Sequence, residues 1–396
     1  MGRNPNSESA RNLRTNVSVA HLYHVSRPSH LSWKEKVELA LEADFLDEEQ
    51  NAVGHCACLI LKPGNSQDFG NNNFKKSKAE FYEILKKVHA AGGNSIRIWL
   101  HCRGESTPYM TNDGMTIRLD VRNTFIYDVR EYLWMARRLN ILVFLVLWNG
   151  ALPIGSQHWK LQGLLKDGVK LQSYITRALK PLVTAIKDEP SLGGWEIINE
   201  PEGVIKTYVP SKNRCENTLK LIFSGAGWAG YEFTMREIQR FINWQADAIH
   251  SIDPKSLVTV GAWSVRSMTD QLGWTNYYHD NCLYEAGRRS LGYLDFFEVH
   301  SYATFGYYRN FSPFKNEKKA YGLKKPMIIG EFSQAAGAGM NITKQFEYIY
   351  NNGYSGAWSW QANALGKNSD SLETQLKGLR TLKGRSDHGY IQVILD

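Results

Sequence analysis

The feature that most constrains this chain is a sustained alternation of short apolar runs with helix-sized amphipathic stretches. The apolar runs are eight in number, at residues 56–61, 95–100, 141–148, 195–198, 256–261, 294–300, 326–332 and 354–360. Such alternation favours a parallel sheet covered by helices on both faces. Eight units favour closure into a (β/α)8 TIM barrel over an open doubly wound sheet, and no Gly-x-Gly-x-x-Gly run follows the first predicted strand.

The connections between these runs carry the helical periodicity. We expect helices over residues 76–91, 123–139, 170–187, 234–252, 276–289, 315–321, 341–351 and 371–382. The first apolar run is the weakest of the eight as a strand. The chain is predicted to be α/β throughout, with the barrel as a single domain.

Length and composition agree with one large domain. A chain of 396 residues with 43% hydrophobic residues can bury the core of one barrel with insertions. Residues 51–396 are assigned to the barrel and residues 1–50 to an atypical N-terminal extension. Its first 30 residues are polar and without periodicity, which predicts a poorly ordered arm, and a capping-box pattern at Ser32 then predicts a helix.

Charge and cysteine content exclude several classes of protein. The formal net charge is +8, but the basic residues are spread along the chain, which argues against nucleic-acid binding. No apolar run is long enough to cross a membrane. Five scattered cysteines do not predict a disulfide framework, and no Cys, His or Asp cluster has metal-ligand spacing. An aromatic content of 12% serves core packing and could also serve sugar stacking.

Two glutamates end predicted strands. Glu200 follows the run Trp195–Ile198 and Asn199, and the next residue, Pro201, cannot continue a sheet ladder. Glu331 ends a second apolar run in the same way. Active sites of such barrels lie at the C-terminal ends of the strands. The two carboxyl groups are therefore predicted to face one pocket, as the acid and the nucleophile of a glycosidase do.

Other chemistry-bearing side chains occupy the same strand ends. These are a basic group, an amide, histidines, a tyrosine and several indoles, at Arg97, His101, Trp148, Asn199, Trp263, His300, Tyr302 and Trp360. Carboxylates together with indoles and hydrogen-bonding groups are typical of a site that binds and cleaves sugars. Each residue also has a plainer interpretation: Asn199 could cap a loop, His300 and Tyr302 could be packing residues, and one of Trp358 and Trp360 is expected to be core.

The order and spacing of four motifs resemble glycoside hydrolase family 5. They are WEIINEPEG, FFEVHSY, IIGEF and GAWSW, and the further motifs SGAGWAG, FINWQ and DFGNN resemble more narrowly the endo-1,4-β-mannanases of molluscs and other invertebrates. The resemblance covers roughly residues 68–365. It implies retaining hydrolysis of β-1,4-mannosidic bonds in mannan, galactomannan or glucomannan, without a metal or a cofactor.

The resemblance also implies a role for each site residue. Glu200 matches the acid/base and Glu331 the nucleophile. Asn199 matches the amide that binds the sugar 2-hydroxyl, and Arg97 the arginine that keeps the nucleophile ionised. The remaining matches are a subsite pair, His300 and Tyr302; an indole platform, Trp360; and three weaker candidates for subsite walls, Trp148, His101 and Trp263. Glu196 and Glu202 are expected to be solvated or structural.

Two other interpretations of the function remain open. One is an endo-β-1,4-glucanase on the same machinery, because mannose and glucose differ only in the orientation of one hydroxyl group. The other is a catalytically impaired sugar-binding barrel, because the segment HCACLIL replaces the usual first strand of the mannanase branch.

The resemblance further suggests a secreted enzyme that acts as a monomer on a polysaccharide. A signal peptide is not visible at the N-terminus, whereas three acceptor sequons mildly favour secretion. Cys215 and Cys282, both expected in loops on the active-site face, are candidates for a disulfide if the chain is secreted. Their spacing does not decide the pairing.

Overall fold

A computed structural model describes residues 56–60, 68–102, 104–151, 159–230, 233–362, 368–388 and 393–395. For residues 56–60 the description is of the backbone alone. The predictions for residues 1–50, a poorly ordered arm followed by a helix after Ser32, lie outside the described residues.

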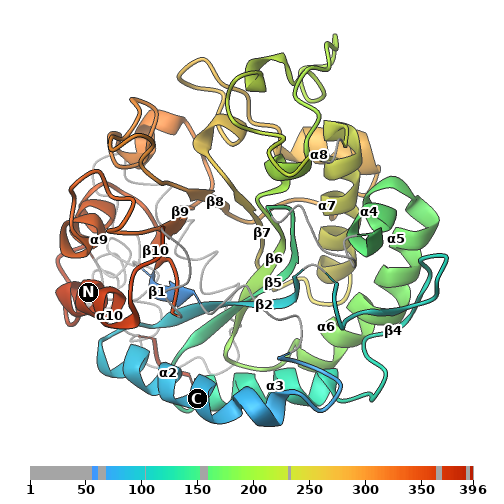
Figure 1. Cartoon of the computed structure of the whole chain (residues 1–396), viewed down its shortest axis with the longest axis horizontal. Helices are drawn as coiled ribbons and strands as arrows, with labels where there is room; N and C mark the ends of the chain where they lie inside the picture. The colour runs from blue at the N-terminus through green and yellow to red at the C-terminus, as the bar shows by residue number, and fades with distance from the viewer. Residues whose placement is uncertain are drawn as a thin grey trace, which may run out of the picture.

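Eight parallel strands close into a barrel, which confirms the predicted fold class (Figure 1). Around the barrel the strands are β1 (Cys56–Ile60), β10 (Gly356–Ser359), β9 (Met327–Phe332), β8 (Phe297–His300), β7 (Val258–Ala262), β6 (Leu192–Asn199), β5 (Leu142–Asn149) and β2 (Ser95–Cys102). The strand β1 closes the barrel because it pairs with both β10 and β2, in the registers Cys56 to Gly356 and Cys58 to Ser95. The weakest of the predicted strands therefore forms a barrel strand over its described residues, Cys56–Ile60.

The helices form a ring outside the strands, as Figure 1 shows. They are α2 (Phe74–Ala90), α3 (Phe125–Arg137), α4 (Trp159–Lys166), α5 (Gly168–Tyr174), α6 (Lys180–Ile186), α7 (Met235–His250), α8 (Asp280–Gly287), α9 (Ile342–Asn351) and α10 (Leu372–Leu382). A π-helical turn, Ile175–Leu179, joins α5 to α6 within the predicted helix 170–187. The predicted helix 315–321 is only a 3-10 turn, Lys318–Tyr321.

Two elements had no clear signal in the sequence. One is α4, which follows a segment outside the described residues, and the other is the short hairpin of β3 (Tyr109–Met110) and β4 (Thr116–Arg118). The strongest local signal belongs to α7. Thr234 accepts a hydrogen bond from the amide of Glu237, and the Glu237 carboxylate bonds back to the amide of Thr234, which fixes the first turn of the helix.

The inside of the barrel changes from apolar to charged along the strands. At the N-terminal ends, a compact cluster fills the interior: Leu142, Phe144, Leu257, Phe296, Ile328, Trp358 and Val393. Further along the barrel, Arg97 on β2, Glu196 on β6 and Glu298 on β8 are all buried. A larger apolar core lies between the strands and the helix ring. The layering places these three buried charges at the end of the barrel where the candidate site lies.

Candidate active site

The backbone at Glu200 turns the carboxyl group out of the sheet. Asn199 is the last residue of β6, and Glu200 adopts φ +42° and ψ +55° before Pro201 begins a 3-10 turn. Left-handed conformations are uncommon for residues other than glycine and cluster at functional sites. The conformation is held by the Glu200 amide, which donates to the Gly261 carbonyl, and by the Gly203 amide, which donates to the Glu200 carbonyl. Glu331, in contrast, lies within β9 and is buried.

His300 at the end of β8 lies between the two carboxyl groups. Its Nδ1 atom is 2.7 Å from Oε1 of Glu200 and 3.5 Å from Oε2 of Glu331. One oxygen of each carboxyl group and the Nδ1 atom all lie within 4.8 Å of one another. The structure therefore brings together the two glutamates that the sequence predicted to face one pocket.

Arg97 crosses the barrel interior below these groups. Its Nη1 atom donates to Glu331 at 2.9 Å, and its Nη2 atom donates to Asn199 Oδ1 at 2.6 Å. The Nε and Nη2 atoms form a fork with both oxygens of Glu196, at 2.5 and 2.6 Å. Because Arg97 is fully buried, this one guanidinium orients the candidate nucleophile and the candidate amide together. Glu196 is structural, as expected.

The pKa values in this cluster follow from burial and from charge pairing. Burial raises the pKa of Glu331, and the positive charges of His300 and Arg97 oppose that rise. Burial also disfavours the imidazolium of His300, but Glu331, Glu200 and Glu298 together outweigh it and raise the pKa of His300 to about 10. The cation at His300 and the guanidinium at Arg97 thus both favour an ionised Glu331.

Tyr302 and Asn199 complete the polar wall. The Tyr302 hydroxyl donates to Oε2 of Glu331 at 3.0 Å, and burial together with the negative charge of Glu331 raises the pKa of Tyr302 well above its usual range. The Asn199 amide nitrogen donates to Oδ1 of Asn149 at 3.1 Å. Asn149 also ends a predicted strand, and the sheet register places it at the end of β5 next to Asn199.

Aromatic side chains flank the charged cluster. Trp360 follows β10 and is half-buried against Trp99 and its neighbours, whereas Trp358 belongs to the barrel core. Trp263 follows β7, with the Arg266 guanidinium 4.4 Å from its ring, and Trp228 lies 6.2 Å from the same ring. Trp228 is part of the SGAGWAG motif, so that motif could have indicated this residue as a neighbour of the site.

Two predicted subsite walls are not exposed. His101 and Trp148 have no solvent-accessible surface, and their rings lie 5.0 Å apart within an aromatic group that includes Tyr174. Burial and the positive charge of Lys160 lower the pKa of His101 to about 3, so this imidazole is neutral. A buried ring offers no face to a sugar, and the assignment of these two residues as subsite walls is corrected accordingly. The residues preceded a strand end, which is why they resembled site residues.

Glu202 holds together the loops beside the site. It is completely buried rather than solvated, and it accepts hydrogen bonds from the hydroxyls of Ser267 and Tyr278 and from the amide of Trp263. Burial raises the pKa of Glu202, and these donors counteract the rise. Its role is structural, because it fixes the position of the Trp263 backbone.

A disulfide joins Cys215 to Cys282 across 67 residues of chain. Cys215 lies in the long connection between β6 and α7, as expected, whereas Cys282 lies in α8 rather than in a loop. Cys102, the last residue of β2, is buried.

Glu200, His300 and Glu331 also form the one group, within the described part of the chain, whose ligand atoms are close enough to surround a metal ion. Their positions are explained by their bonds to one another, to Arg97 and to Tyr302, and a cation would compete with the guanidinium for Glu331. We assign no metal to this cluster.

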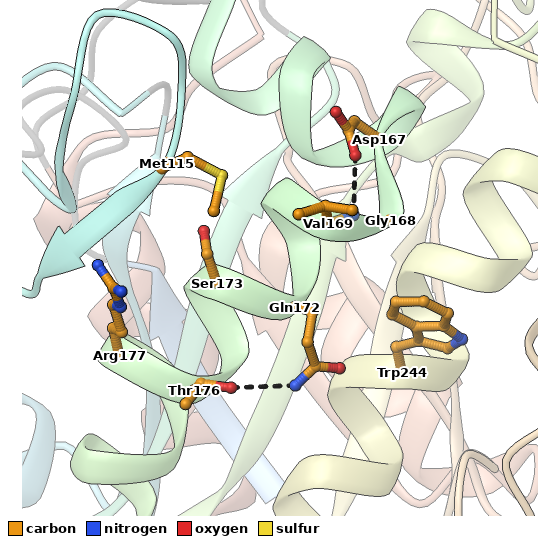
Figure 2. Close-up of a pocket in the computed structure, with 9 residues that line it drawn as sticks. All are labelled: Met115, Asp167, Gly168, Val169, Gln172, Ser173, Thr176, Arg177 and Trp244. Atoms are coloured by element: carbon orange, nitrogen blue, oxygen red, sulfur yellow. Dashed lines mark hydrogen bonds between the residues drawn. The ribbon is translucent and has the colours of Figure 1, made fainter.

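A separate groove lies on the outside of the helix ring and is not part of this site (Figure 2). It has a volume of about 640 Å³ and runs between the β4 segment, α5 and α7, with Met115, Gln172, Arg177 and Trp244 among its lining residues. Among the residues drawn, Gln172 bonds to Thr176, and the Asp167 carboxylate accepts from the amide of Val169. None of the strand-end residues described above lines it.

A parallel barrel with two carboxyl groups facing each other at the ends of β6 and β9 defines the class of barrel glycoside hydrolases. No family model matches the chain. A curated relative, the mannan endo-1,4-β-mannosidase of Mytilus edulis, is 48% identical over 327 residues, which cover 83% of this chain and 87% of the relative.

Solved structures agree with that relationship. The chain is 46% identical to the β-mannanase of Mytilus edulis, with a TM-score of 0.81, covering 86% of this chain and 94% of the other. It is 44% identical to the endo-1,4-β-mannanase of Eisenia fetida, with a TM-score of 0.83, covering 86% and 95%. The chain belongs to the mannan endo-1,4-β-mannosidase family of invertebrate glycoside hydrolases. Within the described residues, no helix is both long and apolar enough to span a membrane.

Proposed function

We propose that this protein is an endo-acting, retaining hydrolase of β-1,4-mannosidic bonds in mannan, galactomannan or glucomannan. Glu331 attacks the anomeric carbon while protonated Glu200 gives its proton to the departing glycosidic oxygen. Glu200 then removes a proton from water, which attacks the same carbon, releases the sugar and restores Glu331. The two inversions leave the configuration of the anomeric carbon unchanged.

The observation that carries the proposal is the close approach of the two carboxyl groups on either side of His300. Retaining glycosidases place their carboxyl groups about 5–5.5 Å apart, whereas inverting ones leave about 6.5–9.5 Å for a water. An oxygen of Glu200 and an oxygen of Glu331 within 4.8 Å of each other support the retaining arrangement.

The polar and aromatic neighbours support roles in sugar binding. Asn199, held by Arg97, is suited to bond the 2-hydroxyl of the sugar at the cleaved position, and Tyr302 to steady Glu331. The half-buried indoles of Trp360 and Trp263 are suited to stack on sugar rings. Buried His101 and Trp148 are left out of the proposed site.

The first test is reducing-sugar release from galactomannan and from carboxymethylcellulose by the purified protein. We expect release from galactomannan that Glu200→Ala and Glu331→Ala both abolish, and Glu373→Ala, an exposed glutamate on α10, serves as the matched control. Release only from the cellulose derivative would assign the glucanase activity instead. A folded protein that releases sugar from neither would be the impaired sugar-binding barrel.

A second test separates the two glutamates. An aryl β-mannoside with a good leaving group needs little proton donation, so Glu200→Ala should form the glycosyl-enzyme from it but hydrolyse that intermediate slowly. Added azide should then restore turnover and give a β-mannosyl azide. In Glu331→Gly, azide should replace the nucleophile and give the α-azide. The opposite pairing of variants and products would reverse the assigned roles.

We also propose that the enzyme is secreted and monomeric. The disulfide between Cys215 and Cys282 supports an oxidising compartment, because disulfides are rare where thiols are kept reduced. Recovery of the native protein outside the cells that make it, with both thiols blocked to alkylation, and a scattering mass near 45 kDa are the expected results. An intracellular pool with free thiols, or a dimeric mass, would contradict these two assignments.

A further inference from the structure

Below the proposed catalytic pair lies a buried carboxyl group that the mechanism does not use. Glu298 on β8 is completely buried, and neither of its oxygens accepts a well-formed hydrogen bond from the described residues. An isolated carboxylate in a protein interior costs several kcal/mol, so it must be paired or protonated. The cations nearest to it are Arg97, with Nε 3.3 Å from Oε1, and His300, with Nε2 3.8 Å from the same oxygen.

Arg97 is already engaged elsewhere. Its Nε and Nη2 atoms form the fork with Glu196, and its Nη1 atom bonds to Glu331. The Nε2 atom of His300, by contrast, is buried and makes no hydrogen bond in the described structure. The Nε2 atom of His300 and the Oε1 atom of Glu298, neither of which makes a hydrogen bond in the described structure, therefore face each other at 3.8 Å. On the other side of the imidazole, Nδ1 bonds to Glu200.

The strands on both sides make room for this arrangement. A Cβ atom at Gly330 on β9 would lie 2.2 Å from Oε1 of Glu298, and one at Gly261 on β7 would lie 2.5 Å from Glu196 and 3.1 Å from Nε2 of His300. Real Cβ atoms essentially never come within 3.0 Å of such neighbours, so the two shortest of these contacts would force the side chains or strands to move. The glycines on β7 and β9 therefore leave the space that the buried carboxyl groups and the imidazole occupy.

We propose that Glu298 is a positioning residue that keeps His300 as an imidazolium, with Nε2–H directed at Glu298 and Nδ1–H donated to Glu200. The inference rests on the proposed roles of Glu200 and Glu331. The positive charge of His300 faces both catalytic carboxyl groups. Glu298, which does not contact the sugar, then maintains that charge. Burial and the neighbouring Glu196 raise the pKa of Glu298, and the positive charges of Arg97 and His300 oppose that rise.

The charged groups around His300 come from four strands and their ends. They are Arg97 on β2, Glu196 and Glu200 at β6, Glu298 and Tyr302 at β8, and Glu331 on β9. Among them, Glu298 is the one that faces Nε2 directly. Replacing it with glutamine keeps the shape and removes the counter-charge, so His300 should become neutral at a lower pH.

The direct test is an NMR titration of His300 in the whole protein, labelled with ¹⁵N in its histidine rings. In the wild type we expect His300 to stay protonated far above the ordinary range of histidine, with a midpoint near its raised pKa of about 10. In Glu298→Gln the midpoint should fall by roughly 1–3 pH units, the effect of one opposite charge at this range. Glu298→Asp should recover part of the fall.

The matched control is Glu202→Gln, which neutralises a second buried carboxyl group beside the site that does not contact His300. Its His300 midpoint should equal that of the wild type. An unchanged midpoint in Glu298→Gln, or an equal fall in both variants, would overturn the proposal. If Glu298→Gln does not fold, Glu298→Asp takes its place, because its His300 midpoint should also lie below that of the wild type. A wild-type midpoint near 6.5 would overturn the proposal by itself.

The pH profile of kcat/KM on galactomannan gives a second readout. The His300 midpoint in Glu298→Gln should still lie above the acid limb, so the imidazolium 3.5 Å from Glu331 is kept there. The change should appear on the basic side, where His300 loses its charge at a lower pH and the basic limb moves to lower pH. A residue that acted only on folding would lower activity without moving the limb. The NMR titration needs no turnover, so a wild type without mannanase activity would refute the proposed function and leave this inference testable.

Discussion

The Nη1 atom of Arg97 lies 2.9 Å from Oε1 of Glu331, although the two residues are 234 positions apart in the chain. The same guanidinium also bonds to Glu196 and Asn199. Because Arg97 is fully buried, these bonds are shielded from water and define the orientation of the nucleophile before any substrate arrives. The closed barrel is what brings β2, β6 and β9 around one side chain.

Arg97→Lys keeps the positive charge at this position but should still lower the activity strongly. Lysine cannot form the fork with Glu196 while it reaches Glu331 and Asn199. We expect kcat/KM on galactomannan to fall by roughly 10²–10³-fold, the range for loss of a preorganised donor. Arg97→Met, which also leaves buried carboxylates unpaired, should lower the free energy of unfolding by about 3–5 kcal/mol.

The control for both variants is Arg130→Met, which breaks the exposed pair with Glu189. Its free energy of unfolding should change by no more than about 1 kcal/mol. Denaturant unfolding measures the stabilities and initial rates on galactomannan measure the activities. An Arg97→Lys variant as active as the wild type would contradict the orienting role.

Tyr302→Phe tests the hydrogen bond on the other oxygen of Glu331. The Tyr302 hydroxyl bonds to the ionised form of Glu331 and so lowers its pKa, against the rise that burial causes. Without that donor the pKa of Glu331 rises further. Activity requires ionised Glu331 and is lost as pH falls through this pKa, so the acid limb of kcat/KM should move to higher pH.

The loss in kcat/KM above the limb should correspond to roughly 1.5–3 kcal/mol, the value of a hydrogen bond to a charged group. Tyr307→Phe, a half-exposed tyrosine in the same loop, is the control and should leave the limb unchanged. A lower rate in Tyr302→Phe with the limb in its wild-type position would indicate that Tyr302 contacts the sugar rather than tuning the nucleophile.

The disulfide should contribute to stability through the unfolded chain. Closing a loop of 67 residues removes chain entropy worth roughly 4 kcal/mol in the loop-closure model. Cys215→Ser with Cys282→Ser should lower the free energy of unfolding by about 2–5 kcal/mol. The link also ties the connection that carries Trp228 to α8, so KM for galactomannan should rise. Cys102→Ala is the control, and an equal loss from it would argue against a specific role for the disulfide.

The sequence predicted those parts of the molecule that depend on local pattern and on short motifs. The barrel follows from the alternation of apolar runs and helices, and Glu200 and Glu331 follow from their places at strand ends. The burial of His101 and Trp148 could not be predicted, because it depends on Tyr174 and Phe125 of neighbouring helices, which pack over the strand ends. Strand alternation alone does not reveal which strand-end residues are covered.

The network of buried charges could not be predicted from the sequence either, and the reason is physical. Glu196 and Glu298 look like solvated or incidental carboxylates in one strand each, and only closure of the barrel brings both to Arg97. The α4 helix and the β3–β4 hairpin lack the strong periodicity of the barrel units because they are short and belong to its periphery. Tertiary contacts, rather than local preference, determine all of these features.

Gly330→Ala tests whether the space around Glu298 is required. The new Cβ atom would lie 2.2 Å from Oε1 of Glu298 and 2.4 Å from its Cγ, so β9 or the Glu298 side chain must move. Overpacking of this kind should lower the free energy of unfolding by about 1–3 kcal/mol. Because the adjacent residue is Glu331, kcat should also fall.

Gly163→Ala on α4 is the matched control: its nearest neighbour is a flexible lysine carbon at 3.4 Å, and alanine favours a helix. The control should be as stable as the wild type or more so. Equal behaviour of the two variants in denaturant unfolding and in initial rates would mean that β9 can shift without disturbing the charged layer, and the nucleophile would then not depend on its fixed position.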